Sequence, residues 1–148
     1  YIGKDNRNQA NQTAQNSIII AFFMALINFL FIYFLGKDAL ILQGINLDVL
    51  NLALEYFYVM AYGSLFMIFG IFLRAILIGE GESLIPMSAL GIGTIVNIIL
   101  DPFFIDYWSI AGAAYATIVS QVLSVLVMSF FIIIKKTTYI DLSFSNFK

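Results

Sequence analysis

The chain has 148 residues, of which 61% are hydrophobic and 11% are charged, and its formal net charge is −2. Soluble domains are usually about 45–50% apolar and about 25% charged, so this composition excludes an ordinary water-soluble globule and predicts a membrane-embedded protein. The small net charge and the lack of a basic block give no sign of a nucleic-acid partner.

Four apolar runs predict four transmembrane helices, since about 20 residues are enough to cross about 30 Å of hydrocarbon. The runs are continuous and lack the alternation of barrel strands, which favours helices. They cover residues 17–35, 55–78, 84–105 and 109–134, and the second has an amphipathic lead-in from Asn46 or Asp48. Stretches at 36–38, 79–83 and 106–108 are expected to separate them. The predicted fold class is therefore an all-α membrane protein.

Basic residues predict the orientation of these spans. With four spans, the N-terminus, the 79–83 loop and the C-terminus lie on one side of the membrane. That side carries six of the seven basic residues, and the other carries only Lys37. The positive-inside rule therefore predicts cytoplasmic termini, and we expect a multi-pass protein of a prokaryotic inner membrane. Because Tyr1 is not an initiator Met and residues 1–17 are polar, we expect no signal peptide and interpret the chain as part of a longer one.

Asp101 needs an explanation, because it lies in the third apolar run, where an ionised side chain costs at least about 2.5–3.5 kcal/mol. Thr94 and Asn97 share its helical face, and such a face is expected to line the bundle interior or a water-filled cavity. The alternative is that Asp101-Pro102 ends the helix at the membrane interface, leaving 103–105 as a loop.

The fourth run contains a second polar stripe, formed by Thr117, Ser120, Gln121 and Ser124. Thr117 is expected at a depth similar to that of Asn97 and Asp101. Carboxylate, amide and hydroxyl oxygens together suit a hard cation such as Na⁺, and a buried Asp can instead carry a proton. The alternative is that the Ser and Thr residues, beside the small residues 111–114, only permit close helix packing.

Other candidate residues have simpler interpretations. Arg74 is expected to snorkel to the membrane surface, and Glu80 and Glu82 are expected to form a solvated loop in which Ser83 caps the next helix. Neither Cys nor His occurs, and the runs contain no paired carboxylates, so we expect no enzyme, no thiolate metal site and no bound cofactor. Two further sets are expected to pack helices, namely the glycines Gly91 and Gly93 and the aromatic residues Tyr56, Phe57, Tyr58 and Tyr62, which can also line a cavity.

A succession of motifs resembles the multidrug and toxic compound extrusion (MATE) transporters. The motifs are IGKDNRNQA before the first run, LDVLNLALEYFYVMAYGSLFM into the second, GEGESLIPM before the third, and NIILDPFFI and SIAGAAYATIVSQ in the last two. Their order and spacing are similar to those of helices three to six in the amino-terminal half of that family. Residue Ile78 departs from the pattern, since relatives often have a basic residue before the glycine loop.

The resemblance implies a twelve-helix transporter with two six-helix bundles around a central cavity. The four spans would form part of the amino-terminal bundle, and 135–148 would be a cytoplasmic linker between the bundles. Such proteins export organic cations or drugs in exchange for H⁺ or Na⁺. The resemblance also implies that Asn97 and Asp101 form a cation-coupling pair, with Thr117 as the hydroxyl from the next helix. An acidic residue of the family's first helix lies outside this chain, which is therefore not expected to transport alone.

Two other functions remain open at this point. A lipid-linked-oligosaccharide flippase of the same superfamily would share the bundle, but its cavity should contain several basic residues, and here the spans contain only Arg74. A structural membrane protein without transport activity would tolerate Asp101→Asn. The expected partners are an organic cation or drug-like substrate, the lipid bilayer and the rest of the transporter.

Overall fold

The computed structural model describes residues 7–135, and within this range the chain forms four α-helices and no strand. The helices are α1 (Arg7–Leu42), α2 (Leu47–Gly79), α3 (Leu84–Trp108) and α4 (Ile110–Lys135). All four are long and apolar enough to cross a membrane, which confirms the predicted fold class. Apart from Lys135, the predicted linker at 135–148 lies outside the described residues.

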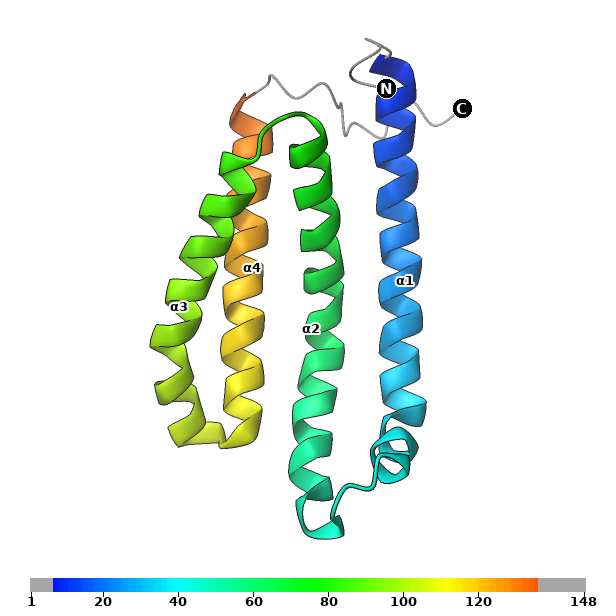
Figure 1. Cartoon of the computed structure of the whole chain (residues 1–148), viewed down its shortest axis with the longest axis vertical. Helices are drawn as coiled ribbons and strands as arrows, with labels where there is room; N and C mark the ends of the chain where they lie inside the picture. Colours follow the sequence, from blue (N-terminus) through cyan, green and yellow to red (C-terminus); the bar gives the residue numbers. More distant parts are fainter. Residues whose placement is uncertain (1–6, 136–148) are drawn as a thin grey trace.

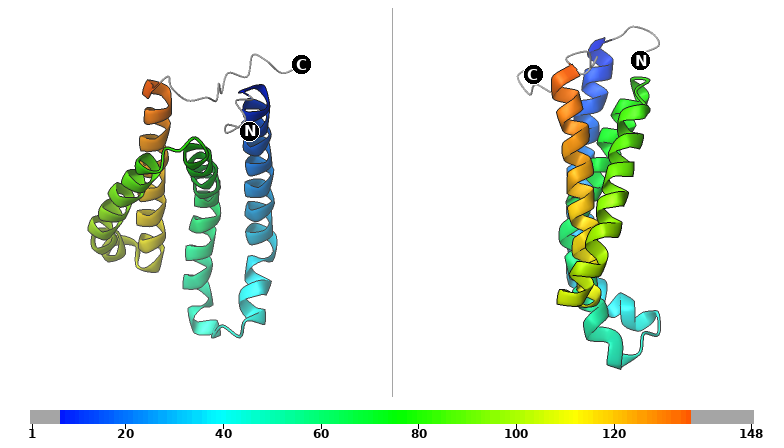
Figure 2. Two further views of the ribbon diagram at one scale, coloured as in Figure 1. Left: turned by 45° about the horizontal axis from the view of Figure 1, so that its top comes forward. Right: turned by 90° about the vertical axis from the view of Figure 1, so that its left-hand side faces the viewer.

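The helices stand side by side in the order α1, α2, α4, α3, so that α4 packs between α2 and α3 (Figures 1 and 2). The turn at 43–46 and the turn at Ser109 lie at one end of the molecule, called here the hairpin end. The 80–83 turn lies at the opposite end, together with the start of α1 and the end of α4. Both figures show the α1–α2 turn projecting beyond the α3–α4 turn.

The first helix is longer than the predicted span. We expected 36–38 to separate two helices, but α1 continues to Leu42. Gly36 is buried, and an added Cβ there would find ordinary contacts at 3.5 Å with Ile32 and Phe57. The site is thus a packed helix interior, and the prediction of a turn was wrong. Figure 1 shows the last turns of α1, in cyan, bent away from the preceding ones.

The chain instead reverses at 43–46, where Gly44 has a φ of 78° that favours glycine. Asn46 is the N-cap of α2, and its side-chain oxygen accepts a hydrogen bond from the Asp48 backbone N–H at 3.3 Å. This confirms the predicted lead-in to the second span.

The turn between α2 and α3 lies where it was predicted. Gly81 has a φ of 85° at this turn. The expected cap at Ser83 is wrong, however, because Ser83 has helical backbone angles and its side chain makes no capping hydrogen bond. A cap serves the N–H groups of the second and third helical residues, and the third here is Pro86, which has no N–H.

The third helix does not end at Asp101-Pro102. It continues through Pro102 to Trp108, so the alternative loop at 103–105 and the expected break at 106–108 are both wrong. Membrane helices tolerate an internal Pro because neighbouring groups satisfy the freed carbonyl. The chain reverses only at Ser109, whose φ is 52°.

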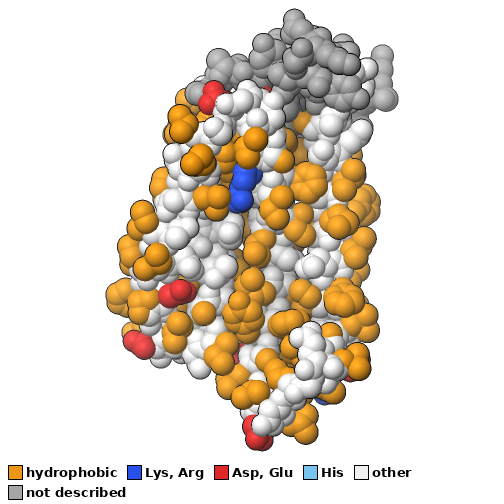
Figure 3. Space-filling model, viewed as in Figure 1, with side chains coloured by type: hydrophobic (Ala, Val, Ile, Leu, Met, Phe, Trp, Pro, Cys, Tyr) orange, Lys and Arg blue, Asp and Glu red, His pale blue; other side chains and the backbone are white. Residues whose placement is uncertain are grey.

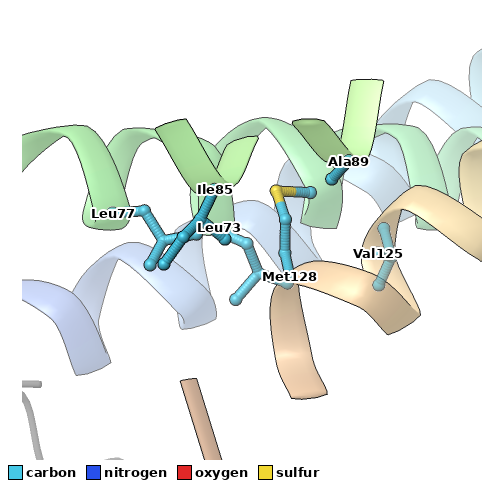
Figure 4. Close-up of a cluster of buried hydrophobic side chains, with 6 residues drawn as sticks. All are labelled: Leu73, Leu77, Ile85, Ala89, Val125 and Met128. Atoms are coloured by element: carbon cyan, nitrogen blue, oxygen red, sulfur yellow. The ribbon is translucent and has the colours of Figure 1, made fainter. Parts of the chain in front are cut away.

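Buried apolar side chains gather between α2, α3 and α4 towards the 80–83 turn. This cluster consists of Leu73, Leu77, Ile85, Ala89, Val125 and Met128 (Figure 4). Elsewhere many large apolar side chains are exposed, and Figure 3 shows them over most of the visible face. An apolar surface of this extent suits lipid as the surrounding solvent.

Candidate cation-binding site

Asn97 and Asp101 lie one turn apart on α3 and are both partly buried. The Asn97 Nδ2 donates to Asp101 Oδ1 over 3.5 Å, longer than the usual distance of about 2.9–3.0 Å. Thr94, on the same helical face, is exposed. The carboxylate therefore has one weak partner from its own helix and keeps most of its capacity to accept another group.

The neighbouring contact between α3 and α4 is made by small residues. A Cβ added to Gly93 would overlap the Ser124 hydroxyl and lie 3.0 Å from the Ser120 carbonyl oxygen. The Ser124 hydroxyl donates to the Ala89 carbonyl at 2.9 Å across the two helices. Ser120 and Ser124 are buried, so the packing interpretation of the α4 stripe is correct for these two residues.

The other two polar residues of the stripe face different directions. Gln121 is turned towards α2, since its Oε1 would lie 4.0 Å from a Cβ on Gly70. Thr117 is partly buried, and its hydroxyl donates to the Ala113 carbonyl at 2.9 Å. This bond uses the hydroxyl hydrogen, so the oxygen lone pairs remain available as acceptors or ligands.

Helix geometry brings Thr117 to the level and side of Asp101. Each residue lies eight positions from Ser109, which is about 12 Å along each helix. Asp101 lies about 80° around α3 from Gly93, and Thr117 lies about 60° in the same sense around α4 from Ser120. Gly93 faces Ser120 at the contact between the two helices. Because the helices are antiparallel, a rotation in the same sense around each one leads to the same side of the α3–α4 pair, so Asp101 and Thr117 lie on one flank of this pair. In the described part of the chain no hydrogen bond joins Asp101 to Thr117.

Pro102, expected only as a possible helix end, takes one helical hydrogen-bond donor away from the backbone near the Asn97–Asp101 pair. Inside α3, Pro102 has no N–H to donate to the carbonyl four residues earlier, which belongs to Ile98. That carbonyl lies in the turn that joins Asn97 to Asp101. In the sequence, this missing donor is indicated by Pro102 itself.

The site offers one carboxylate and several neutral oxygens. Within 7–135 no group of three or more His, Cys, Asp or Glu side chains could hold a metal ion. One negative charge with amide and hydroxyl oxygens suits a proton or a monovalent cation, whereas tightly held divalent ions usually have more carboxylates.

Arg74 does not belong to this site. Gly70 faces Val125, so Arg74 is level with residue 129 of α4, about 18 Å along the axis from Thr117. Its Nε is buried and has no hydrogen-bond partner among the described residues. Arg74 as a whole is only partly buried, so burial of the Nε alone does not test the expected snorkelling anchor, which stays a prediction.

The MatE family model matches residues 1–103 of the chain. Over 140 residues the chain is 29% identical to Protein DETOXIFICATION 43 of Arabidopsis thaliana, covering 88% of this chain and 26% of that protein. Over 103 residues it is 32% identical to Probable multidrug resistance protein YpnP of Bacillus subtilis (strain 168), covering 68% of this chain and 23% of that protein. The chain thus spans about a quarter of the length of these curated relatives.

Solved structures of MATE proteins share the fold. The chain matches the inward-facing conformation of a multidrug resistance MATE family transporter with a TM-score of 0.90 and 30% identity, over 95% of this chain and 32% of that one. It matches an outward-facing conformation equally well, with a TM-score of 0.90 and 29% identity over 99% of this chain and 33% of that one. These matches confirm the resemblance seen in the motifs, and the chain belongs to the MATE family of multi-pass membrane transporters.

Proposed function

We propose that this chain supplies helices three to six of the amino-terminal half of an antiporter, which exports organic cations or drugs in exchange for H⁺ or Na⁺. The observation that carries the proposal is the Asn97–Asp101 pair inside a continuous apolar helix. The helix continues past Asp101 and does not use it as a cap, so capping does not account for the carboxylate there. A role in ion coupling would explain why the chain keeps an ionisable side chain in an apolar helix, where it costs free energy.

Antiport requires two ligands that exclude each other, and one carboxylate is enough for this. An Asp101 that holds a proton or Na⁺ is neutralised and no longer attracts an organic cation on the same flank. When the ion leaves, the anion attracts the cation again. Unit charges 4 Å apart interact by about 4 kcal/mol at an effective dielectric constant of about 20, which is enough for strong competition. Asn97 and Thr117 would supply neutral oxygens to the ion.

The comparisons support a role of this unit as a rigid body. The TM-score is 0.90 against both the inward-facing and the outward-facing conformation, so a unit of this kind keeps its internal arrangement in both. The close contact of α3 and α4 at Gly93 and Gly112 provides a physical reason. In such transporters alternating access comes from moving one bundle against another.

We also propose that the termini of the chain are cytoplasmic and that the hairpin end faces outwards. The support is the basic asymmetry expected from the sequence, together with Lys37 being the one basic residue at the hairpin end within residues 7–135. A cation released outwards would then leave past the end that is poor in basic residues.

The proposal is tested by Asp101→Asn in the full-length transporter that contains this chain, reconstituted in vesicles with an imposed H⁺ or Na⁺ gradient. We expect gradient-driven efflux to be lost while expression is unchanged, because an amide keeps the shape but can neither carry a proton on an anion nor neutralise Na⁺. Asn97→Ala should weaken cation affinity less, and Thr117→Ala least, since water can replace a hydroxyl. Comparing the two gradients identifies the coupling ion.

A matched control is Asp106→Asn on the same helix, because Asp106 is exposed near the hairpin end. This variant should transport like the wild type. Normal efflux in Asp101→Asn would contradict the coupling role and favour a structural membrane protein. A transporter that moves lipid-linked oligosaccharide but no organic cation would favour the flippase.

A further inference from the structure

A cavity lies between α2 and α4 at the hairpin end, with a volume of about 580 Å³. Its lining includes Glu55, Tyr58 and Tyr62 of α2, Trp108 at the end of α3, and Tyr115 of α4. Tyr115 precedes Thr117 by two residues, so the two side chains lie about 200° apart around α4. The cavity is therefore on the opposite side of α4 from the Asn97–Asp101 pair.

Neighbouring rings hold the aromatic walls of this cavity in place. On the α2 side, Tyr58 packs against Tyr33 of α1 with a centroid distance of 6.2 Å. Tyr62 packs against Phe29 of α1 at 5.4 Å. On the other side, Trp108 and Tyr115 contact each other edge to face at 5.7 Å. Aromatic faces fixed before a ligand arrives reduce the entropy lost on binding.

The charge of the cavity has one sign. Glu55 is the only Asp, Glu, Lys or Arg in its lining. Around it, the hairpin end of the described chain carries three further carboxylates, Asp38, Asp48 and Asp106, and a single Lys37. A carboxylate beside several aromatic faces attracts a cation both by charge and by cation–π interaction.

Polarity changes along the length of the cavity. Gly63 faces Ile118, so Glu55 is level with the start of α4 at the α3–α4 turn. Phe66 lies eleven residues further along α2, about 16 Å deeper, and this deeper part is lined by apolar side chains that include Val59 and Ile118. The shape suits a ligand with a charged end and an apolar body.

We infer that this cavity is a binding site for a lipophilic organic ammonium ion at the membrane surface. The ammonium group lies by Glu55 among the aromatic rings, and the apolar body extends towards Phe66. No Lys or Arg in the lining can meet a phosphate, so a cation without an anionic group fits better than a phospholipid head group. Binding here does not depend on the proposed antiport.

The test uses the full-length transporter in lipid nanodiscs, with Trp108 kept as its single Trp, as it is in this chain. The probe is N-butylpyridinium, a lipophilic cation whose ring quenches Trp fluorescence on contact. We expect saturable quenching of Trp108, whereas neutral acrylamide should quench without saturation. Equilibrium titration without an ion gradient keeps this result separate from any failure of transport.

Variants assign the binding to the cavity. Glu55→Gln should weaken pyridinium affinity by about two- to five-fold. Tyr115→Leu should cause a similar loss because it removes a ring face, and Tyr115→Phe should restore the affinity. The matched control is Asp106→Asn, an exposed carboxylate at the same end that does not line the cavity, and it should weaken the affinity clearly less than Glu55→Gln does.

Three results would overturn the inference. Quenching that never saturates would mean that no site exists. Equal losses in Glu55→Gln and Asp106→Asn would mean that surface charge alone concentrates the cation. A phospholipid that co-purifies with the protein, is released by Glu55→Gln in a phosphorus assay and leaves no pyridinium binding would assign the cavity to a lipid head group.

Discussion

Replacement of Gly112 by Ala should destabilise the α3–α4 hairpin, although Ala is normally the better helix former. A Cβ at this position would overlap the Phe104 carbonyl and lie 2.7 Å from the Ile105 backbone nitrogen. These atoms belong to the backbone of the partner helix, so no side chain can rotate away. The two helices would have to move apart where the Ser109 turn holds them together.

The size of the effect follows from two opposing contributions. In an open helix position, Gly→Ala favours the helix by about 1 kcal/mol. Forcing extra volume into a packed contact costs about 1–3 kcal/mol, and a rigid backbone partner places Gly112 at the upper end. We expect a net loss of about 2 kcal/mol for Gly112→Ala.

Gly91 provides the matched comparison, because nothing lies within 4 Å of a Cβ added there. Gly91→Ala should be neutral or stabilising by up to about 1 kcal/mol. The two variants should therefore differ by about 2–3 kcal/mol in the free energy of unfolding. Unfolding by SDS in mixed micelles, followed by circular dichroism, measures this difference. A Gly112→Ala protein as stable as Gly91→Ala would refute the backbone contact.

Two further predictions concern the proposed transporter. A reporter fused after Gly81 should report a cytoplasmic position, because the basic residues gather on that side; an external signal would reverse the orientation and move Asp101 towards the inner leaflet. Vesicles that contain only these 148 residues should show no gradient-driven dye efflux, since the chain spans only 32% of the matched inward-facing transporter, and efflux by this chain alone would contradict its proposed role as one part of a bundle.

The helices were predictable from the sequence because hydrocarbon thickness sets a minimum length for an apolar run. The same reasoning predicts where a helix can cross the membrane and says little about where it ends. Residues 36–38 and 106–108 are polar enough for the membrane surface, but they continue α1 and α3 as helix. The actual reversals occur at Gly44, Gly81 and Ser109, where φ is positive. The two glycines were visible signals, whereas a Ser with positive φ was not.

The candidate site was predictable where it depends on a single helix. The four-residue spacing of Asn97 and Asp101 predicted a shared face, and the structure adds the hydrogen bond between them. The polar stripe of α4 was harder to interpret, because the sequence of α4 does not tell which of these residues face α3 and which face α2. Ser124 bonds to α3, whereas Thr117 does not. The aromatic cavity draws on three helices and on ring contacts with α1, which no local pattern contains.

Packing and chemistry on α3 come from one series of residues spaced by four, namely Ala89, Gly93, Asn97 and Asp101. Each step of four residues advances about 40° beyond a full turn. The series therefore starts at the α4 contact, where Ala89 is fully buried, and reaches the flank at Asp101, which is only partly buried. One residue inserted between Gly93 and Asn97 would rotate Asp101 about the α3 axis by about 100° more relative to Gly93. Asp101 would then lie on the side of α3 away from Thr117. The small residues that hold α3 against α4 thus also fix the side of α3 on which the Asp101 carboxylate lies.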